Sequence, residues 1–121
     1  MLRLAVAAFV VCLLQPLLPQ TARADTITWR FKSEHRSVVN FELYASGRRH
    51  IWPGGGEVYS LKDSGSHTVK IACNAGEKVC YGAWVRNSRS KEWGAGYGGK
   101  GACQSCCYRC DGGETPILVM R

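Results

Sequence analysis

The sequence predicts an all-β domain, a small antiparallel β-sandwich with a small barrel as the alternative, which carries a disulfide-rich knob near its C-terminus. Short segments of alternating apolar and polar residues recur with turn-forming residues between them. No segment has the 3.6-residue periodicity of an amphipathic helix. Six of the seven cysteines lie between positions 73 and 110 of a 121-residue chain. Cross-links matter in so short a domain, because its core alone stabilises it only modestly.

The first 24 residues have the features of a secretory signal peptide. Arg3 precedes an apolar run over residues 4–14, and small residues before position 25 form a cleavage site. The alternative is a membrane anchor, but Gln15 and Pro16 interrupt the run short of the roughly 20 apolar residues that a bilayer span needs. We therefore expect residues 25–121 to form one secreted or periplasmic domain without a membrane span. Cleavage removes two of sixteen basic residues and no acid, which leaves a net charge of +5 and six cysteines.

The predicted domain begins with two alternating segments. Residues 26–32 put Trp29 on their apolar face, and residues 39–44 repeat the pattern after a polar turn at 33–37. We expect these two strands to form a hairpin, with Trp29 in the core. A shorter strand at 50–52 ends at a proline and three glycines, because proline cannot donate to a ladder and glycine favours turns.

Four more strands are expected along the rest of the chain. They cover residues 57–61, 67–73, 81–86 and 116–120, the last of which closes a sheet. Cys73 and Cys80 flank a turn, so we expect a disulfide between them across an antiparallel pair. The glycine-rich segment 92–99 indicates irregular backbone.

The remaining cysteines form two overlapping Cys-x-x-Cys units at Cys103, Cys106, Cys107 and Cys110. An even cysteine count in a short exported chain indicates disulfides, so we expect all six cysteines to be bonded and no metal to be bound. Four thiolates can also close a zinc site, although such sites usually join two separated units. Redox catalysis is a further alternative, but the chain lacks a βαβ pattern. Adjacent cysteines are poor partners for each other, and the pairing within the cluster stays open.

The sequence contains no convincing catalytic motif. The histidines lie in turns or at strand edges, outside the known metal and hydrolase motifs. Asp63 and Ser64 beside His67 superficially suggest a base and a nucleophile, but loop composition explains them. We therefore expect no enzyme, no catalytic residue and no cofactor.

Aromatic and basic residues occur together in two parts of the chain. Tryptophan and tyrosine can stack on sugar rings, and arginine attracts phosphates, sulfates and carboxylates. The alternative is a plain basic surface around core tryptophans. The candidate ligand-binding residues are Arg48, Arg49, Trp52, Trp84, Arg86, Trp93 and Tyr97. In a glycan-binding protein, Trp52→Ala and Trp93→Ala are expected to abolish binding without unfolding the domain.

These observations predict an exported, non-catalytic binding domain for a glycan or an anionic polymer of the cell envelope. The alternative is a protein-interaction module, such as an inhibitor or an envelope assembly factor, with a protein partner. A nucleic-acid partner is not expected, because acidic residues interrupt the positive charge and no recognition helix is present.

Several segments resemble small exported bacterial proteins of uncharacterised function. The resemblance lies in residues 52–56, 73–84, 93–94, 106–108 and 110–116 and spans most of the predicted mature chain. It implies a bacterial exported protein, and it implies no activity and no site residues.

Overall fold

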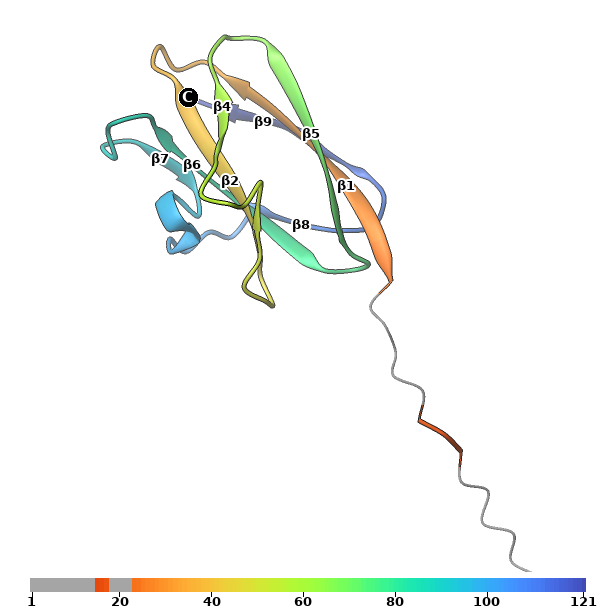
Figure 1. Cartoon of the computed structure of the whole chain (residues 1–121). Coiled ribbons are helices and arrows are strands. Elements are labelled where there is room, and N and C mark those ends of the chain that lie inside the picture. Colours follow the sequence, from red (N-terminus) through yellow and green to blue (C-terminus); the bar gives the residue numbers. More distant parts are fainter. Residues whose placement is uncertain (1–14, 18–22) are drawn as a thin grey trace, which may run out of the picture.

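The structure is a computed structural model that describes residues 15–17 and 23–121. This part of the chain contains nine strands and a short 3-10 turn, η1 (Tyr97–Gly99) (Figure 1). The strands are β1 (Ala24–Ser33), β2 (Val39–Ala45), β3 (Ile51–Trp52), β4 (Tyr59–Leu61), β5 (Ser66–Asn74), β6 (Lys78–Val85), β7 (Glu92–Gly94), β8 (Cys107–Arg109) and β9 (Glu114–Met120). Among the described residues, no helix is long and apolar enough to cross a bilayer. The signal peptide predicted for residues 1–24 lies mostly outside the described residues.

The strands form two sheets, which confirms the predicted all-β sandwich. The first sheet has the order β5-β1-β9, and the second has the order β3-β2-β6-β7, with β4 also paired to β2 and β8 to β6. Neighbouring strands are antiparallel except β9, which runs parallel to β1. The sheets do not close into a barrel. β9 confirms the strand expected at the end of the chain.

The predicted hairpin between the first two strands is wrong, because β1 and β2 belong to different sheets. Each strand has one face of large apolar side chains. These two faces meet across the core, where the rings of Phe31 and Phe41 are 4.2 Å apart. Placing the strands in opposite layers buries both faces against each other, whereas a hairpin would have put them side by side.

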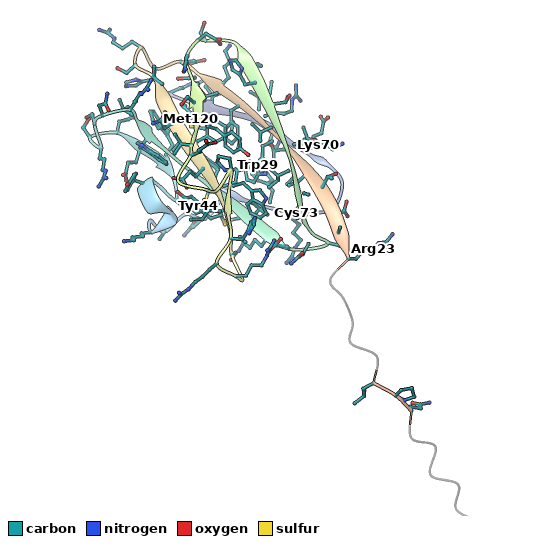
Figure 2. All side chains as sticks on the ribbon, viewed as in Figure 1. Arg23, Trp29, Tyr44, Lys70, Cys73 and Met120 are labelled. Carbon is teal, nitrogen blue, oxygen red and sulfur yellow. A yellow bond between two sulfur atoms is a disulfide. The ribbon has the colours of Figure 1, made fainter. Side chains whose placement is uncertain are left out.

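The core lies between the two sheets and is rich in aromatic rings. Trp29 is fully buried, as predicted, and stacks against Phe31 with ring centroids 5.8 Å apart. Tyr81 from β6 and Tyr108 from β8 meet Trp29 edge-on. Figure 2 shows Trp29 inside the sandwich and Lys70 of β5 on its outside. The alternation of the sequence therefore identifies the inward faces of β1 and β2 correctly.

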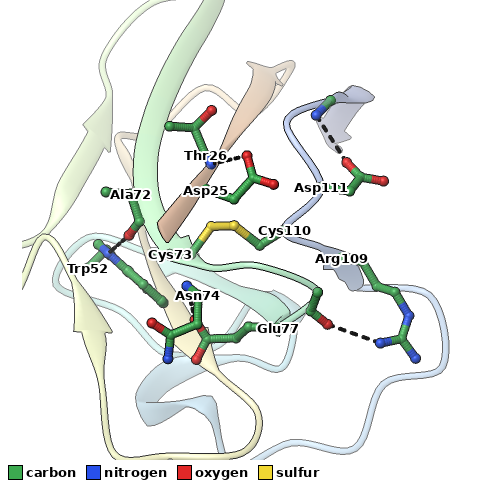
Figure 3. The surroundings of a disulfide bond; sticks show 12 residues. Asp25, Thr26, Trp52, Ala72, Cys73, Asn74, Glu77, Arg109, Cys110 and Asp111 are labelled. Atoms are coloured by element: carbon green, nitrogen blue, oxygen red, sulfur yellow. Dashed lines mark hydrogen bonds between the residues drawn. A yellow bond between two sulfur atoms is a disulfide. The ribbon is translucent and has the colours of Figure 1, made fainter. Parts of the chain in front are cut away.

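Six cysteines form three disulfides, but the expected bond between Cys73 and Cys80 is wrong. Cys73 pairs with Cys110, and Cys80 pairs with Cys107. Although β5 and β6 are consecutive in the sequence, they lie in different sheets. Cys73 faces the core and bridges the two sheets (Figure 3), whereas Cys80 is on the outer face of the second sheet. There Cys80 and Cys107 are directly opposed in an antiparallel pair, with Cα atoms 4.0 Å apart.

The third disulfide joins Cys103 to Cys106 within the loop before β8. The four C-terminal cysteines are therefore not one closed cluster. Cys107 is tied to β6 and Cys110 to β5, so the segment is fastened to both sheets. The zinc alternative, which required these four thiolates to meet, does not describe this arrangement.

Candidate ligand-binding site

The candidate site lies on the outer face of the second sheet. Because side chains alternate along a strand, Asn40 of β2 and Trp84 of β6 both point away from the core. The two residues are also direct neighbours across the ladder. This face is therefore the place where a polar β2 side chain meets an aromatic β6 side chain.

A glycine-rich segment, residues 95–101, crosses this face. Its backbone is fixed by Ala95, whose N–H donates to the carbonyl of Tyr81 at 2.9 Å, and by Gly101, whose N–H donates to the carbonyl of Ala95 at 2.8 Å. Gly82 makes the close approach possible, because a Cβ at this position would overlap the carbonyl oxygen of Gly96. The segment thus rests directly on the sheet and divides its outer face into two hollows.

The first hollow, which we call the Trp84 pocket, has a volume of about 370 Å³. The aromatic part of the pocket is a pair of rings, with Trp84 and Tyr97 nearly perpendicular and 5.0 Å between centroids. The Arg89 guanidinium lies over the Tyr97 ring, 3.6 Å from its centroid. Trp84 is 6% exposed and Tyr97 is 44% exposed, so Tyr97 is the more accessible ring. The pocket is lined by Asn40, Trp84, Val85, Asn87, Ser88, Arg89 and Tyr97.

Hydrogen-bonding groups make up most of the rest of the pocket. The Asn40 Oδ1 accepts a hydrogen bond from the Ser60 hydroxyl at 2.8 Å, which orients its amide. Asn87 occupies a turn with φ of 61°, a conformation that asparagine tolerates better than most residues. The Ser88 hydroxyl contacts that of Ser90 at 2.8 Å. Aromatic rings beside amides and hydroxyls suit a ligand that has both apolar faces and many hydroxyl groups.

The turn between β6 and β7 is positively charged. It carries Arg86, Arg89 and Lys91 and no acidic residue. Its shape is held by the Arg86 N–H, which donates to the carbonyl of Val38 at 2.8 Å, and by the Ser88 N–H, which donates to the carbonyl of Val85 at 3.1 Å. The positive charge at the mouth of the Trp84 pocket therefore favours a ligand with carboxylate, sulfate or phosphate groups.

The structure brings together only some of the predicted ligand-binding residues. Trp84 and Tyr97 share the pocket, and Arg86 is in its bordering turn. Trp93 is elsewhere, because it is paired with Ala83 and therefore lies on the inner side of the sheet, where it packs against the core. Its indole N–H donates to the carbonyl of Arg121 at 3.0 Å. Trp84 and Trp93 are therefore on opposite sides of the second sheet and cannot contact one ligand together.

Three further predicted residues, Arg48, Arg49 and Trp52, lie away from the Trp84 pocket. Trp52 is 8% exposed and belongs to the core, and its indole N–H donates to the carbonyl of Ala72 at 3.1 Å (Figure 3). Arg48 forms a two-pronged ion pair with Glu77. Arg49 lines a separate hollow of about 430 Å³ beside the glycines that follow Pro53. Two of these three residues therefore have structural partners, and only Arg49 lines a hollow.

Sequence reasoning missed Asn40, Asn87 and Ser88 as site residues. The alternation of residues 39–44 already placed Asn40 on the outward face, but only the pairing of β2 with β6 reveals that it lies next to Trp84. Asn87 and Ser88 are residue types common in turns, so the sequence offered no reason to assign them to a site. Arg89 lies in a segment that mixes aromatic and basic residues, but nothing in the sequence indicated that it stacks on Tyr97.

The Asp63 region behaves as a loop. The Asp63 carboxylate accepts the Gly65 N–H at 2.8 Å and contacts His67 Nε2 at 2.7 Å. The His67 hydrogen bond is the main reason why the Asp63 pKa is lowered. These contacts close the turn before β5, in agreement with the loop interpretation.

No protein-family model, curated protein or solved structure matches this chain. The geometry of the Trp84 pocket is therefore the basis for a functional proposal.

Proposed function

We propose that the protein is an exported, non-catalytic binding domain whose Trp84 pocket takes an acidic glycan of the cell envelope. The observation that carries the proposal is the stacking of Arg89 on Tyr97 beside Trp84. It puts a cation and an aromatic face within reach of one ligand. A sugar ring can pack against the part of Tyr97 that Arg89 leaves exposed while its acidic group pairs with Arg89. Neutral hydroxyls then meet the amides of Asn40 and Asn87.

The covalent framework supports the exported part of this proposal. Three disulfides in a small domain are typical of proteins that mature in an oxidising compartment, such as the periplasm or the cell exterior. Each would be unusual in a reducing cytosol.

The test is calorimetric titration with two polysaccharides that share a backbone and differ only in uronic-acid content. We expect the acidic polymer to bind and the neutral one to bind more weakly, with affinity falling as salt rises. Tyr97→Ala and Arg89→Ala should each weaken binding about tenfold, the loss of a stacked ring or a charge-assisted contact. Near-ultraviolet circular dichroism verifies that each variant is folded.

Two matched variants make this test specific. Tyr97→Phe keeps the ring and should bind like the wild type. Arg49→Ala removes the same charge as Arg89→Ala but from the other hollow, so it should leave affinity nearly unchanged. Equal losses in Arg49→Ala and Arg89→Ala would contradict the proposal and indicate binding to diffuse positive charge. Binding of neither polymer, together with recovery of one defined protein partner, would favour the protein-interaction alternative.

A further inference from the structure

Two of the three disulfides are in contact on the outer face of the second sheet. The sulfur of Cys106 lies 3.7 Å from that of Cys107, although each belongs to a different disulfide. The sulfurs of Cys80, Cys106 and Cys107 all lie within 4.8 Å of one another. A Cys106 thiolate would therefore lie within 4.8 Å of Cys80 Sγ, the sulfur with which it could form a new disulfide.

The outer disulfides Cys80–Cys107 and Cys103–Cys106 are more accessible to solvent than the core disulfide Cys73–Cys110. Cys103, Cys80 and Cys107 line the second hollow on this face, a cavity of about 340 Å³. In contrast, Cys73 and Cys110 are 5% and 0% exposed in the core. A reagent from solution can thus reach the outer disulfides, while the core disulfide is protected.

The two cysteines of the Cys103–Cys106 disulfide are not equally accessible to an attacking thiolate. Cys103 is partly exposed and lines the cavity, whereas Cys106 is only 2% exposed. An incoming thiolate consequently meets Cys103 first, and Cys106 becomes the leaving group. Lys78 lines the same cavity, and a nearby ammonium group favours the thiolate form of a cysteine.

We propose that Cys103–Cys106 is a thiol–disulfide exchange site that accepts electrons from an external dithiol and passes them to Cys80–Cys107. This activity is independent of ligand binding in the Trp84 pocket. Its substrate class is a dithiol, either a small molecule or an exposed Cys-x-x-Cys of another protein.

The exchange proceeds in three balanced steps. A thiolate of the dithiol bonds to Cys103 Sγ, and the electron pair of the broken bond leaves with Cys106 Sγ. The second thiolate of the reagent attacks the reagent's own sulfur in the mixed disulfide, so the reagent departs oxidised and Cys103 becomes a thiol. The Cys106 thiolate then bonds to Cys80 Sγ, and Cys107 leaves as a thiolate that takes a proton from water.

Attack on Cys80 is preferred over attack on Cys107. Bonding Cys106 to Cys107 would close a strained ring across a single peptide bond, whereas Cys80 lies on a different strand. The net result is a dithiol oxidised by two electrons, a new Cys80–Cys106 bond, and thiols at Cys103 and Cys107. The covalent link between β6 and β8 is lost in the process.

Partial reduction followed by peptide mapping tests this proposal on the wild-type protein. The disulfide-bonded protein is incubated with one equivalent of dithiothreitol, trapped by alkylation and digested without further reduction. We expect alkylated Cys103 and Cys107, a peptide that joins Cys80 to Cys106, and an intact Cys73–Cys110 bond. Alkylation confined to Cys103 and Cys106, with no Cys80–Cys106 peptide, would overturn the proposal.

A rate comparison provides a second test. In the double variant Cys103→Ser/Cys106→Ser, reduction of Cys80–Cys107 should be at least about tenfold slower, because the intramolecular route is removed. Ser105→Ala changes the same loop but keeps both cysteines, so its rate should match the wild type. Equal rates in the double variant and the wild type would also overturn the proposal. The wild-type mapping decides the outcome if the double variant fails to fold.

Discussion

At the scale of single residues, burial distinguishes aromatic residues of the core from exposed ones, which the sequence could not distinguish. Trp52 was expected to contact a ligand, but its ring belongs to the core and its indole N–H is bonded to the Ala72 carbonyl. Tyr97 has the opposite character, with 44% of its surface exposed. An aromatic residue can contribute to stability or to binding depending on which neighbours cover it.

Truncation of Trp52 should therefore destabilise the protein. We expect Trp52→Ala to lower the free energy of unfolding by about 3–5 kcal/mol, because it leaves a cavity and an unpaired carbonyl. Urea denaturation followed by circular dichroism measures this change. Tyr97→Ala, on the surface, should cost far less. A Trp52→Ala protein of wild-type stability would show that the ring does not support the core.

Glu77 makes the stability of the protein sensitive to acid. Its carboxylate, whose side chain is 9% exposed, is held by Arg48 and accepts the Asn74 N–H at 2.9 Å. The hydrogen bond from Arg48 is the main cause of its lowered pKa. A carboxylate with a lowered pKa stabilises the fold above its unfolded pKa, and this contribution is lost as pH falls through the folded pKa.

The prediction concerns the variant Glu77→Gln, which keeps an acceptor but cannot titrate. Between its ordinary carboxyl pKa of about 4.3 and the lower folded value, the wild type should lose stability more steeply than the variant. Urea denaturation across pH 2 to 7 measures both slopes. Glu57→Gln, which changes an exposed glutamate outside this contact, is the control and should follow the wild type. Parallel curves for Glu77→Gln and the wild type would refute the assignment.

At the scale of elements, β6 organises both sides of the second sheet. Its inward side chains Val79, Tyr81 and Ala83 belong to or pack against the core. Its outward positions successively hold a disulfide, a glycine that admits the crossing segment, and the aromatic wall of the Trp84 pocket. One strand thus supplies core, cross-link and candidate site through the alternation of its side chains.

A methyl group at position 82 should disrupt the outer face. Gly82→Ala forces the 95–101 segment away from the sheet, and overpacking of this kind typically costs about 1–3 kcal/mol. Because Tyr97 belongs to this segment, ligand affinity should fall as well. Thermal unfolding and calorimetric titration measure the two effects. Gly47→Ala adds the same methyl group where no atom lies within 4 Å, so it should change neither property.

At the scale of the whole molecule, Cys73–Cys110 is the covalent link between the two sheets. The pair is 37 residues apart in sequence, whereas Cys103 and Cys106 are three apart. A cross-link that closes a longer loop removes more entropy from the unfolded chain. The core disulfide is therefore expected to stabilise the molecule more than the loop disulfide.

The corresponding variants should differ in stability. Loss of the core disulfide in Cys73→Ala/Cys110→Ala should lower the free energy of unfolding by about 3–4 kcal/mol, and loss of the loop disulfide in Cys103→Ala/Cys106→Ala by about 2 kcal/mol. Urea denaturation under non-reducing conditions compares them, and intact mass verifies that the other disulfides remain. A larger loss in the loop variant would contradict this ranking.

The sequence by itself determined the features that depend on local pattern. Alternation predicted the longer strands and the inward faces of the first two, so Trp29 was placed in the core correctly, and the even cysteine count predicted a disulfide framework. These features follow from the two-residue period of a strand and from the chemistry of thiols.

Only the tertiary structure decided which segments meet. β1 and β2 are neighbours in sequence but face each other from opposite sheets, and β5 and β6 are likewise separated. Cys73 therefore bonds to Cys110, and Trp84 shares a pocket with Asn40 instead of a surface with Trp93. The physical reason is that a strand's own period specifies which side is apolar, while the partner that covers that side is selected by burial between distant segments.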